Sequence, residues 1–373
     1  MGIEMKEREK EILYWLCQIP GFSPLQIRRL IEKAGSCEDA YYIEGMQLME
    51  WGILHRQERA EQYDLWKREA GRFIEEYRDL SRHGICFVTP FEKEYPQRLL
   101  HIYDYPMGLY VKGRLPDENK PSAAVIGARV CTDYGKQMAY VMAQELAQNG
   151  VSVISGLAAG IDSAGHRGAL EGKGSTFAVM GCGINICYPK ENYDLYEQIV
   201  NTGGILSEYP LGAAPLARNF PIRNRIISGL SDVILVMEAR KKSGSLITAE
   251  LGLEQGKDIF ALPGRVSDPL SEGCNSLIES GAGILLSPAE VLENLGIVYK
   301  KEGLSTGKSS KGLAKNEKMV YSFLDSRPRH AEELAARTGL SISSTMGALL
   351  NLELEGFAVQ VTGLYYTRKI EAD

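Results

Sequence analysis

Residues 121–160 read PSAAVIGARVCTDYGKQMAYVMAQELAQNGVSVISGLAAG and contain two short apolar runs separated by a helical pattern. The apolar runs cover 123–127 and 151–155, and the helical pattern covers 136–148. Neither run alternates apolar with polar residues, which is typical of strands buried on both faces of a parallel sheet. A helix of this length is suited to cross over between two such strands. The stretch therefore predicts a βαβ unit.

The same alternation of short apolar strands and helices continues on the C-terminal side of this stretch. It extends to about residue 297, and we place the start of the domain at residue 85. The pattern predicts an α/β domain over 85–297 with a doubly wound, Rossmann-like parallel sheet. Further strands are expected at 176–180, 205–207, 233–238 and 259–262, with another crossover helix at 248–255.

The segment before this domain, residues 1–84, has apolar residues at three- and four-residue spacing and is predicted to be helical. The turn IPGFS at 19–23 separates LYWLC from LQIRRLIEKAG, which resembles a helix-hairpin-helix or SAM-like module. The amides of such a turn can face a phosphate. The alternative is a small helical packing module, which we favour because acidic residues surround the basic pair Arg28-Arg29.

The C-terminal part of the chain is predicted to be a winged helix on a tether. Residues 298–315 are rich in Gly, Ser and Lys and predict a flexible linker. Within 316–373, three helical patterns at 316–324, 330–337 and 341–355 precede a ribbon at 358–368. The third helix contains no Lys or Arg and carries two glutamates, so we expect it to contact protein, or another copy of itself, rather than duplex DNA.

The composition favours a water-soluble, cytoplasmic protein. Of the 373 residues, 44% are hydrophobic and 24% charged, and no apolar run is long enough to span a bilayer. The first residues contain charges of both signs and no signal-peptide core, so no membrane association is expected. Seven cysteines lack zinc-site spacing, which predicts reduced thiols and no metal.

A basic cluster lies between residues 215 and 242, although the net charge of the chain is −6. Affinity for phosphates depends on local clusters of cations rather than on the total charge. The cluster contains only two acids, Asp232 and Glu238. Its basic members are Arg218, Arg223, Arg225, Arg240, Lys241 and Lys242.

The loops that follow the predicted strands carry small residues, hydroxyls and cations, a combination suited to binding anions. The run GARVCTDYG is not the GxGxxG of a dinucleotide site, and KKSGS lacks Walker A spacing. No cofactor and no nucleoside triphosphatase activity are therefore predicted. The candidate anion-binding residues in these loops are Gly127, Arg129, Ser155, Gly156, Lys242, Ser243, Gly244 and Ser245.

The run FPIRNRIISGLS at 220–231 is the most informative segment. Pro221 fits the first position of a helix, which places Arg223 and Asn224 in the opening turn, where free amides attract anions. Arg223 and Arg225 lie about 200° apart on a helix, so one should face the groove while the other anchors the fold. Phe220, just outside this helix, is either a base-stacking platform or a hydrophobic staple.

Asp162 and His166 lie four residues apart and so on one face of a predicted helix. This pair could act as an acid and a base in catalysis. We favour the alternative, in which Asp162 ties the preceding loop and His166 satisfies a buried partner.

These segments together resemble the DprA/Smf family over roughly residues 95–281. The resemblance rests on GAR, SGLAAGIDSAGH, GCGINICYPKEN, SEYPLG, FPIRNRIISGLSD, EARKKSGSLITA and ALPG, in that order. It implies a Rossmann-like domain without enzymatic activity that binds single-stranded DNA in a basic pocket, forms a homodimer and loads a RecA-type recombinase.

The resemblance also implies roles for individual residues. Arg129 matches the family's pocket arginine, Phe220 its stacking aromatic, and Ser243, Gly244 and Ser245 its phosphate-contacting loop. A lysine expected a few residues before the phenylalanine is absent, and Arg218 is the candidate for its charge.

An alternative function is a nucleotide-binding enzyme of the phosphoribohydrolase ("lysine decarboxylase-like") type, which also binds phosphate at the edge of a sheet. Such enzymes carry PGG-x-G-T followed by a glutamate, whereas this chain reads SGSLITAE, ending at Glu250. The motif is not met, so single-stranded DNA and a recombinase remain the expected partners.

Overall fold

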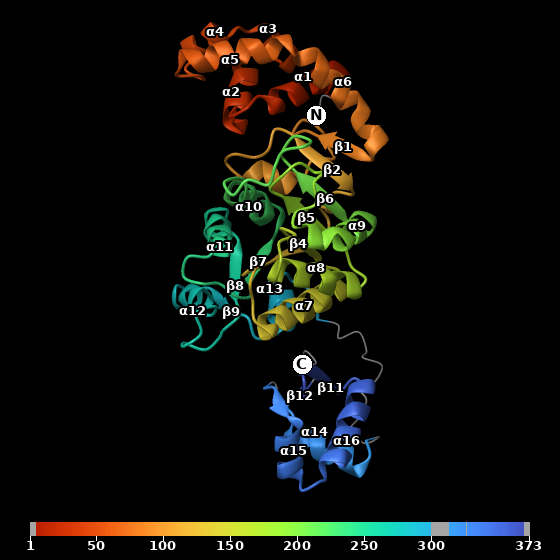
Figure 1. Cartoon of the computed structure of the whole chain (residues 1–373). Coiled ribbons are helices and arrows are strands. Elements are labelled where there is room, and N and C mark those ends of the chain that lie inside the picture. The colour runs from red at the N-terminus through yellow and green to blue at the C-terminus, as the bar shows by residue number, and fades with distance from the viewer. Residues whose placement is uncertain (1–4, 300–312, 326, 369–373) are drawn as a thin grey trace. The chain divides into compact units, whose positions relative to one another are not determined.

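The computed structural model of the protein describes residues 5–299, 313–325 and 327–368. The chain forms two compact units, Met1–Tyr299 and Lys300–Asp373 (Figure 1). Most of the predicted linker, residues 300–312, lies outside the described residues.

The first unit is built on a nine-stranded sheet of order β1-β2-β6-β5-β4-β3-β7-β8-β9. From β6 to β9 all neighbouring strands are parallel, whereas β2 pairs antiparallel with both β1 and β6. All predicted strands are present, with their ends shifted by at most two residues, and β1, β2 and β9 are additional. The strands are β1 (Ile85–Val88), β2 (Leu109–Gly113), β3 (Ser122–Ile126), β4 (Ser152–Ser155), β5 (Thr176–Met180), β6 (Gly204–Ser207), β7 (Val233–Val236), β8 (Asp258–Ala261) and β9 (Gly283–Ile284).

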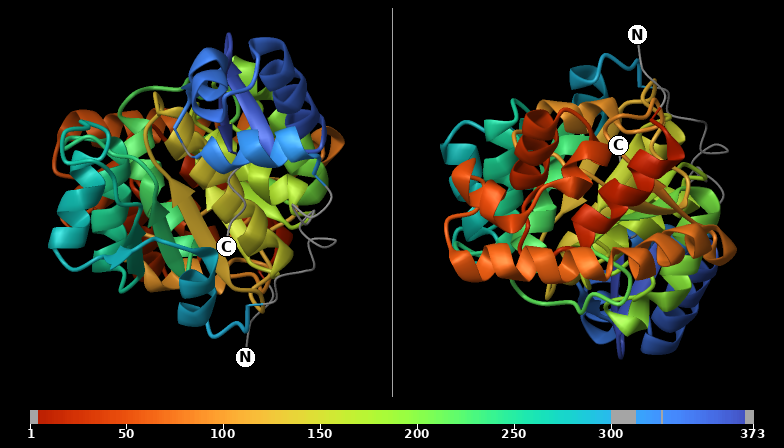
Figure 2. Two further views of the ribbon diagram at one scale, coloured as in Figure 1. Left: turned by 90° about the horizontal axis from the view of Figure 1, so that it is seen from below. Right: turned by 90° about the horizontal axis from the view of Figure 1, so that it is seen from above.

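Helices cover both faces of the sheet, which explains the continuous apolar runs (Figure 2). In β3, Val125 packs with the helices of one face, and Ala124 and Ile126 pack with those of the other. The Rossmann-like, doubly wound α/β fold is therefore confirmed. One face carries α7 (Asp133–Gln148), α8 (Ile161–Glu171), α9 (Tyr193–Thr202) and α13 (Pro288–Asn294), and the other carries α10 (Asn219–Leu230), α11 (Gly244–Glu254) and α12 (Glu272–Glu279).

The N-terminal segment is helical, as predicted, and packs against the antiparallel edge of the sheet. Tyr14 makes edge-to-face contacts with Phe87 of β1 and Tyr110 of β2, with ring centroids 5.0 and 5.7 Å apart. Gln18 donates a hydrogen bond of 2.5 Å to the Tyr110 hydroxyl. The helices and the sheet thus share one buried core. The helices are α1 (Glu7–Gln18), α2 (Pro24–Ala34), α3 (Cys37–Tyr42), α4 (Gly45–Glu50), α5 (Gln57–Arg68) and α6 (Ala70–Asp79), followed by a 3₁₀ turn (Leu80–His83).

The second unit is a winged helix with its own apolar core. Its sheet has the order β10-β12-β11, and the β11–β12 ribbon forms the wing. The short strand β10 occupies the position where the second predicted helix was expected to begin. The elements are α14 (Lys315–Phe323), β10 (Arg329–His330), α15 (Ala331–Thr338), α16 (Ile342–Leu354), β11 (Ala358–Thr362) and β12 (Tyr365–Arg368).

Within the described ranges, no helix combines the length and apolar character that crossing a bilayer requires. All seven cysteines are free thiols. The described residues contain no group of three or more His, Cys, Asp or Glu side chains arranged to hold a metal ion.

Candidate nucleic-acid interface

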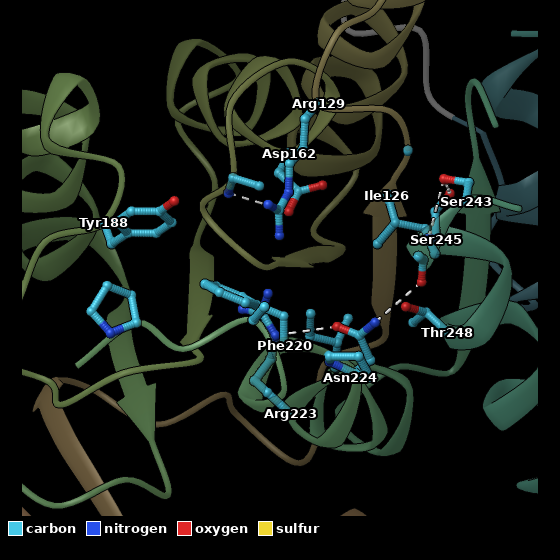
Figure 3. A pocket seen from close by; sticks show the side chains of 17 residues that line it. Ile126, Arg129, Asp162, Tyr188, Phe220, Arg223, Asn224, Ser243, Ser245 and Thr248 are labelled. Atoms are coloured by element: carbon cyan, nitrogen blue, oxygen red, sulfur yellow. Dashed lines mark hydrogen bonds between the residues drawn. The ribbon is translucent and has the colours of Figure 1, made fainter. Parts of the chain in front are cut away.

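A pocket of about 430 Å³ opens at the carboxyl ends of β3, β4, β5 and β7 (Figure 3). β3 and β7 are neighbours in the sheet, and the crossovers that follow them, to β4 and to β8, run in opposite directions. The crevice at such a switch point is where open α/β sheets bind their ligands. The pocket is lined by Ile126, Gly127, Arg129, Ala158, Asp162, Tyr188, Pro215, Ala217, Phe220, Pro221, Arg223, Asn224, Ile227, Ser243, Gly244, Ser245 and Thr248.

Arg223 of α10 is a buried cation in the wall of the pocket, with 3% of its surface exposed. Its guanidinium donates hydrogen bonds to the carbonyl oxygens of Gly156, at 3.0 Å, and Val179. Burial lowers the pKa of Arg223 to about 10, so it stays charged at neutral pH. Because its position is held by backbone carbonyls, Arg223 supplies a fixed positive charge.

Gly156 makes room for the guanidinium of Arg223, and Asp162 balances part of its charge. A Cβ atom at Gly156 would lie 2.6 Å from Arg223 Nη2, so glycine is required for the close approach of the guanidinium. Asp162 accepts hydrogen bonds from the amides of Gly156 and Ala158 at 3.2 and 3.3 Å. Burial raises the pKa of Asp162, and Arg223 and the two amides oppose this rise. Asp162 therefore ties the loop after β4, as we favoured.

Phe220 lies in the centre of the pocket, with cations and another aromatic ring around it (Figure 3). The guanidinium carbons of Arg129 and Arg223 lie 4.9 and 5.8 Å from its ring centroid. The ring of Tyr188 lies 5.7 Å away, tilted by 40°. Arg129 is exposed and makes no hydrogen bond or ion pair with any described residue. The two arginines thus differ: Arg223 is fixed, whereas Arg129 is free to reorient.

The loop after β7 forms the opposite wall and leads into the N-terminus of α11. Ser243 caps the helix and accepts a hydrogen bond from the Ser245 amide at 3.4 Å, and the two hydroxyls are 2.8 Å apart. Asn224 of α10 donates to the Gly244 carbonyl at 3.3 Å, which fixes the two walls relative to each other. Hydroxyls at a helix N-terminus favour an anion here.

Arg225 points away from the pocket, as predicted for one of the two helix arginines. It is bonded to Asp104 at 2.9 Å and to both oxygens of Glu208 at 2.8 Å, and 5% of its side chain is exposed. Arg223 is therefore the arginine that faces the groove, although it also bonds the backbone. Helix α10 begins at Asn219, before the expected Pro221, so Phe220 lies in the first turn rather than outside the helix.

His166 does not reach the pocket. It is fully buried on α8, and its Nδ1 lies 2.7 Å from the hydroxyl of Thr176. Because that hydroxyl donates to the Val153 carbonyl, Nδ1 is the donor to it. Burial lowers the pKa of His166 to about 3. His166 is therefore a buried side chain bonded through Nδ1 to Thr176, with no hydrogen-bond partner at Nε2 among the described residues, and it forms no catalytic pair with Asp162.

The structure places four of the predicted site residues outside the pocket lining. Ser155 is fully buried, and its hydroxyl donates to the Val125 carbonyl at 2.6 Å, so it joins two strands instead of facing a ligand. Gly156 lies behind Arg223. Lys242 is exposed beside the pocket, and Arg218 lines a separate cavity. Arg218 therefore does not supply the charge of the missing lysine to this pocket, and the residue before it, Ala217, lines the wall.

Tyr188 is the main lining residue that sequence reasoning did not select. It follows β5 and so belongs to the same set of strand-end loops as the selected residues. Its position after a predicted strand could have identified it. Its contact with Phe220, 32 positions later in the chain, could not be foreseen.

Known proteins resemble this chain over most of its length. The family model for DNA recombination-mediator protein A matches residues 86–296, and a DprA winged helix domain model matches residues 305–363. Protein Smf of a Synechocystis species is 33% identical over 96% of this chain and 99% of its own length. Protein Smf of Escherichia coli is 37% identical over 82% of this chain and 85% of its own.

Two solved structures are similar. DNA processing protein A from Streptococcus pneumoniae has a TM-score of 0.67 and 33% identity over 78% of this chain and 98% of its own. DNA processing protein A from Helicobacter pylori, solved to study its single-stranded DNA binding mode, has a TM-score of 0.51 and 33% identity over 56% of this chain and 95% of its own. With a family model over more than half of the chain and a relative matched almost end to end, the chain belongs to the DprA/Smf family of DNA recombination-mediator proteins.

Proposed function

We propose that the protein binds single-stranded DNA in the pocket at the carboxyl ends of β3, β4, β5 and β7. The observation that carries this proposal is the arrangement of Phe220 between a fixed arginine, Arg223, and a free one, Arg129. An aromatic ring beside cations holds single strands without sequence preference, because every base has a face that stacks and every nucleotide a phosphate.

Binding requires Arg129 to change its position. Its guanidinium now lies over the Phe220 ring, where a base would stack. Because Arg129 makes no hydrogen bond or ion pair with a described residue, it can swing towards a phosphate and expose the ring. Arg223 stays bonded to Gly156 and keeps the pocket positive while this happens.

In this proposal, the phosphate next to the base on Phe220 binds at the loop of Ser243, Gly244 and Ser245. This loop offers hydroxyls and the N-terminus of α11, and Gly244 leaves its backbone open to close approach. Lys242 beside it adds a flexible charge that needs no fixed geometry.

The wider role follows from the family and from the Helicobacter pylori relative, whose structure concerns single-stranded DNA binding. We propose that the protein acts as a homodimer and delivers the bound strand to a RecA-type recombinase during DNA uptake and recombination, without chemistry of its own. The comparisons favour this mediator role over a phosphoribohydrolase.

The first test is binding of a labelled oligothymidylate across a salt series, with duplex of the same length as the control. A preference for the single strand, with affinity falling as salt rises, supports the proposal. Equal or tighter duplex binding would shift the DNA-binding role to the winged helix. Absence of binding would reopen the enzyme alternative, for which release of free base from a nucleoside monophosphate is the assay.

A further inference from the structure

A second and larger cavity, of about 960 Å³, lies on the other side of the loop that precedes α10. Pro215, Ala217 and Phe220 of this segment face the first pocket, whereas Leu216 and Arg218 face the second cavity. The two cavities are therefore separated by a single stretch of chain. The opposite wall of the second cavity is the turn between α1 and α2 and the first turn of α2, which lie close to this loop in Figure 1.

Two exposed arginines line the second cavity. Arg218 makes no hydrogen bond or ion pair with any described residue. Arg59 donates through Nη1 to the Pro20 carbonyl at 3.0 Å and to Gln62 at 3.2 Å. Its Nε and Nη2 have no hydrogen-bond partner in the described ranges. Arg59 lies directly over Gly21, where a Cβ would come within 2.9 Å of Nη2, so glycine allows it to cover the turn.

The acidic residues in the cavity wall are already paired. Asp104 and Glu208 are both bonded to Arg225, which leaves one net negative charge from this trio. Burial raises the pKa of Glu208, and its contacts with Arg225 oppose this rise. Arg59 and Arg218 contribute two positive charges at the mouth, so the cavity favours an anion.

The cavity also has surfaces on which a base could pack. Tyr209 lines it, with its hydroxyl bonded to the Asn219 carbonyl at 3.0 Å, so the ring is held in place. Ile222 and Leu216 line it with 50% and 41% of their surfaces exposed. Arginines interleaved with an aromatic ring and apolar side chains are the combination that accommodates nucleotides of a single strand.

The second cavity lies between the N-terminal helices and the sheet domain, and these two parts are packed firmly against each other. The helical segment is anchored through Tyr14, Gln18 and Tyr110, and α2 is anchored through Arg28. Arg28 donates to the Tyr103 carbonyl at 3.4 Å and lies 5.1 Å from the ring centroid of Tyr105. Both walls are thus held in one compact unit.

We infer that this second cavity is a further binding site for single-stranded nucleic acid and holds the nucleotides adjacent to those in the Phe220 pocket. The turn between α1 and α2, with Arg59, and the loop with Arg218 contact the phosphates, and Tyr209 contacts a base. This inference rests on the proposed function and gives the N-terminal helices a part in DNA binding.

The test compares two lengths of oligothymidylate on the full-length protein. A strand of about 4 nucleotides should occupy the Phe220 pocket alone, whereas one of about 16 should reach both cavities. We expect Arg59→Ala combined with Arg218→Ala to leave the affinity for the short strand unchanged. The same variant should lose about tenfold affinity for the long strand. Its salt slope should fall by about 1.4, corresponding to two phosphate contacts.

Three controls make the result specific. Arg167→Ala removes an exposed arginine of α8 that lines neither cavity, and both lengths should bind as before. Arg218→Lys should retain the salt slope, because it keeps the charge. A long strand carrying 4-thiothymidine should photocrosslink to the peptide that contains Tyr209 in the wild-type protein.

Each contrary outcome has one meaning. Wild-type affinity of the double variant for the long strand would overturn the inference while leaving the proposed function intact, provided that Arg129→Ala weakens both lengths. Equal losses for both lengths would assign the two arginines to the first pocket and overturn it as well. Failure of the wild-type protein to bind either strand would overturn the proposed function, and this inference with it.

Discussion

Helices α10 and α16 could each be expected to meet DNA, and they differ in charge and in what they expose. The first turn of α10 faces a pocket, and the helix carries Arg223 and Arg225. Helix α16, in the recognition position of the winged helix, has no Lys or Arg. Its exposed side chains include Leu350 and Leu354, with 54% and 77% of their surfaces exposed.

This difference shows that a fold name does not identify the DNA-binding element. A winged helix usually places its recognition helix in the major groove, but contacts with phosphates require cations. Here the cations lie at the strand ends of the α/β unit, and α16 presents apolar surface instead. We therefore expect α16 to contact protein and the α10 pocket to contact DNA.

The largest expected effect concerns the structural arginine of α10. Arg225→Ala would leave the partly buried Glu208 and the half-exposed Asp104 without their partner. The free energy of unfolding should fall by about 3 kcal/mol, because a partly buried charge is left uncompensated. Denaturant unfolding followed by circular dichroism measures this. Arg218→Ala, at the exposed neighbour, is the matched control and should change stability by less than about 0.5 kcal/mol. Equal effects would contradict the division of the arginines into anchoring and free ones.

The next effect concerns the aromatic ring. Phe220→Ala should weaken binding of oligothymidylate by about 1–3 kcal/mol through the loss of one stacking surface. Fluorescence anisotropy with a labelled strand gives the affinity. Leu354→Ala, which truncates an exposed apolar side chain of α16, should leave binding as it is. If the α16 variant were the weaker binder, the comparison between the two helices would be reversed.

A smaller effect is expected at the free arginine of the pocket. Arg129→Ala should lower the salt slope of single-strand binding by about 0.7, as expected for one phosphate contact. Arg129→Lys should keep the slope, because the charge remains. The measurement is the affinity at several salt concentrations. An unaltered slope in Arg129→Ala would mean that Arg129 stays on Phe220 and does not reach a phosphate.

The smallest effect is expected from removing the winged helix. A chain ending at Tyr299 retains the first compact unit, including the whole pocket. Its affinity for oligothymidylate and its salt slope should match those of the full chain. Analytical ultracentrifugation of both chains would show in addition whether the second unit contributes to self-association. A large loss of single-strand binding on truncation would return the DNA-binding role to the winged helix.

The order of elements could be predicted because each depends on local patterns. The continuous apolar runs at β3, β4 and β5 indicate a covered parallel sheet, and the helical spacing between them indicates crossovers. Strands β1 and β9, which lie at the two edges of the sheet, and β2, which lies between β1 and β6, were not predicted. The sheet stabilises them through pairing, not through a distinctive run of their own.

The candidate site could be predicted in part for the same reason. Arg129, Phe220 and the loop of Ser243 follow predicted strands or begin a predicted helix, so their gathering at one edge follows from parallel topology. Which cations are free could not be predicted, because the partner of an ion pair is often far away in sequence. Arg225 is paired with Asp104, 121 residues earlier, while Arg129 has no such partner among the described residues.

By itself, then, the sequence of this protein determined the order of most strands and helices along the chain, the basic cluster and the motifs of its family. Only the tertiary structure decided which cavity each residue of the loop before α10 faces. Ala217 lines the first pocket and Arg218 the second cavity, although they are neighbours in the chain. The physical reason is that adjacent side chains in a turn point in different directions, and packing against distant elements determines which direction meets solvent, a wall or a cavity.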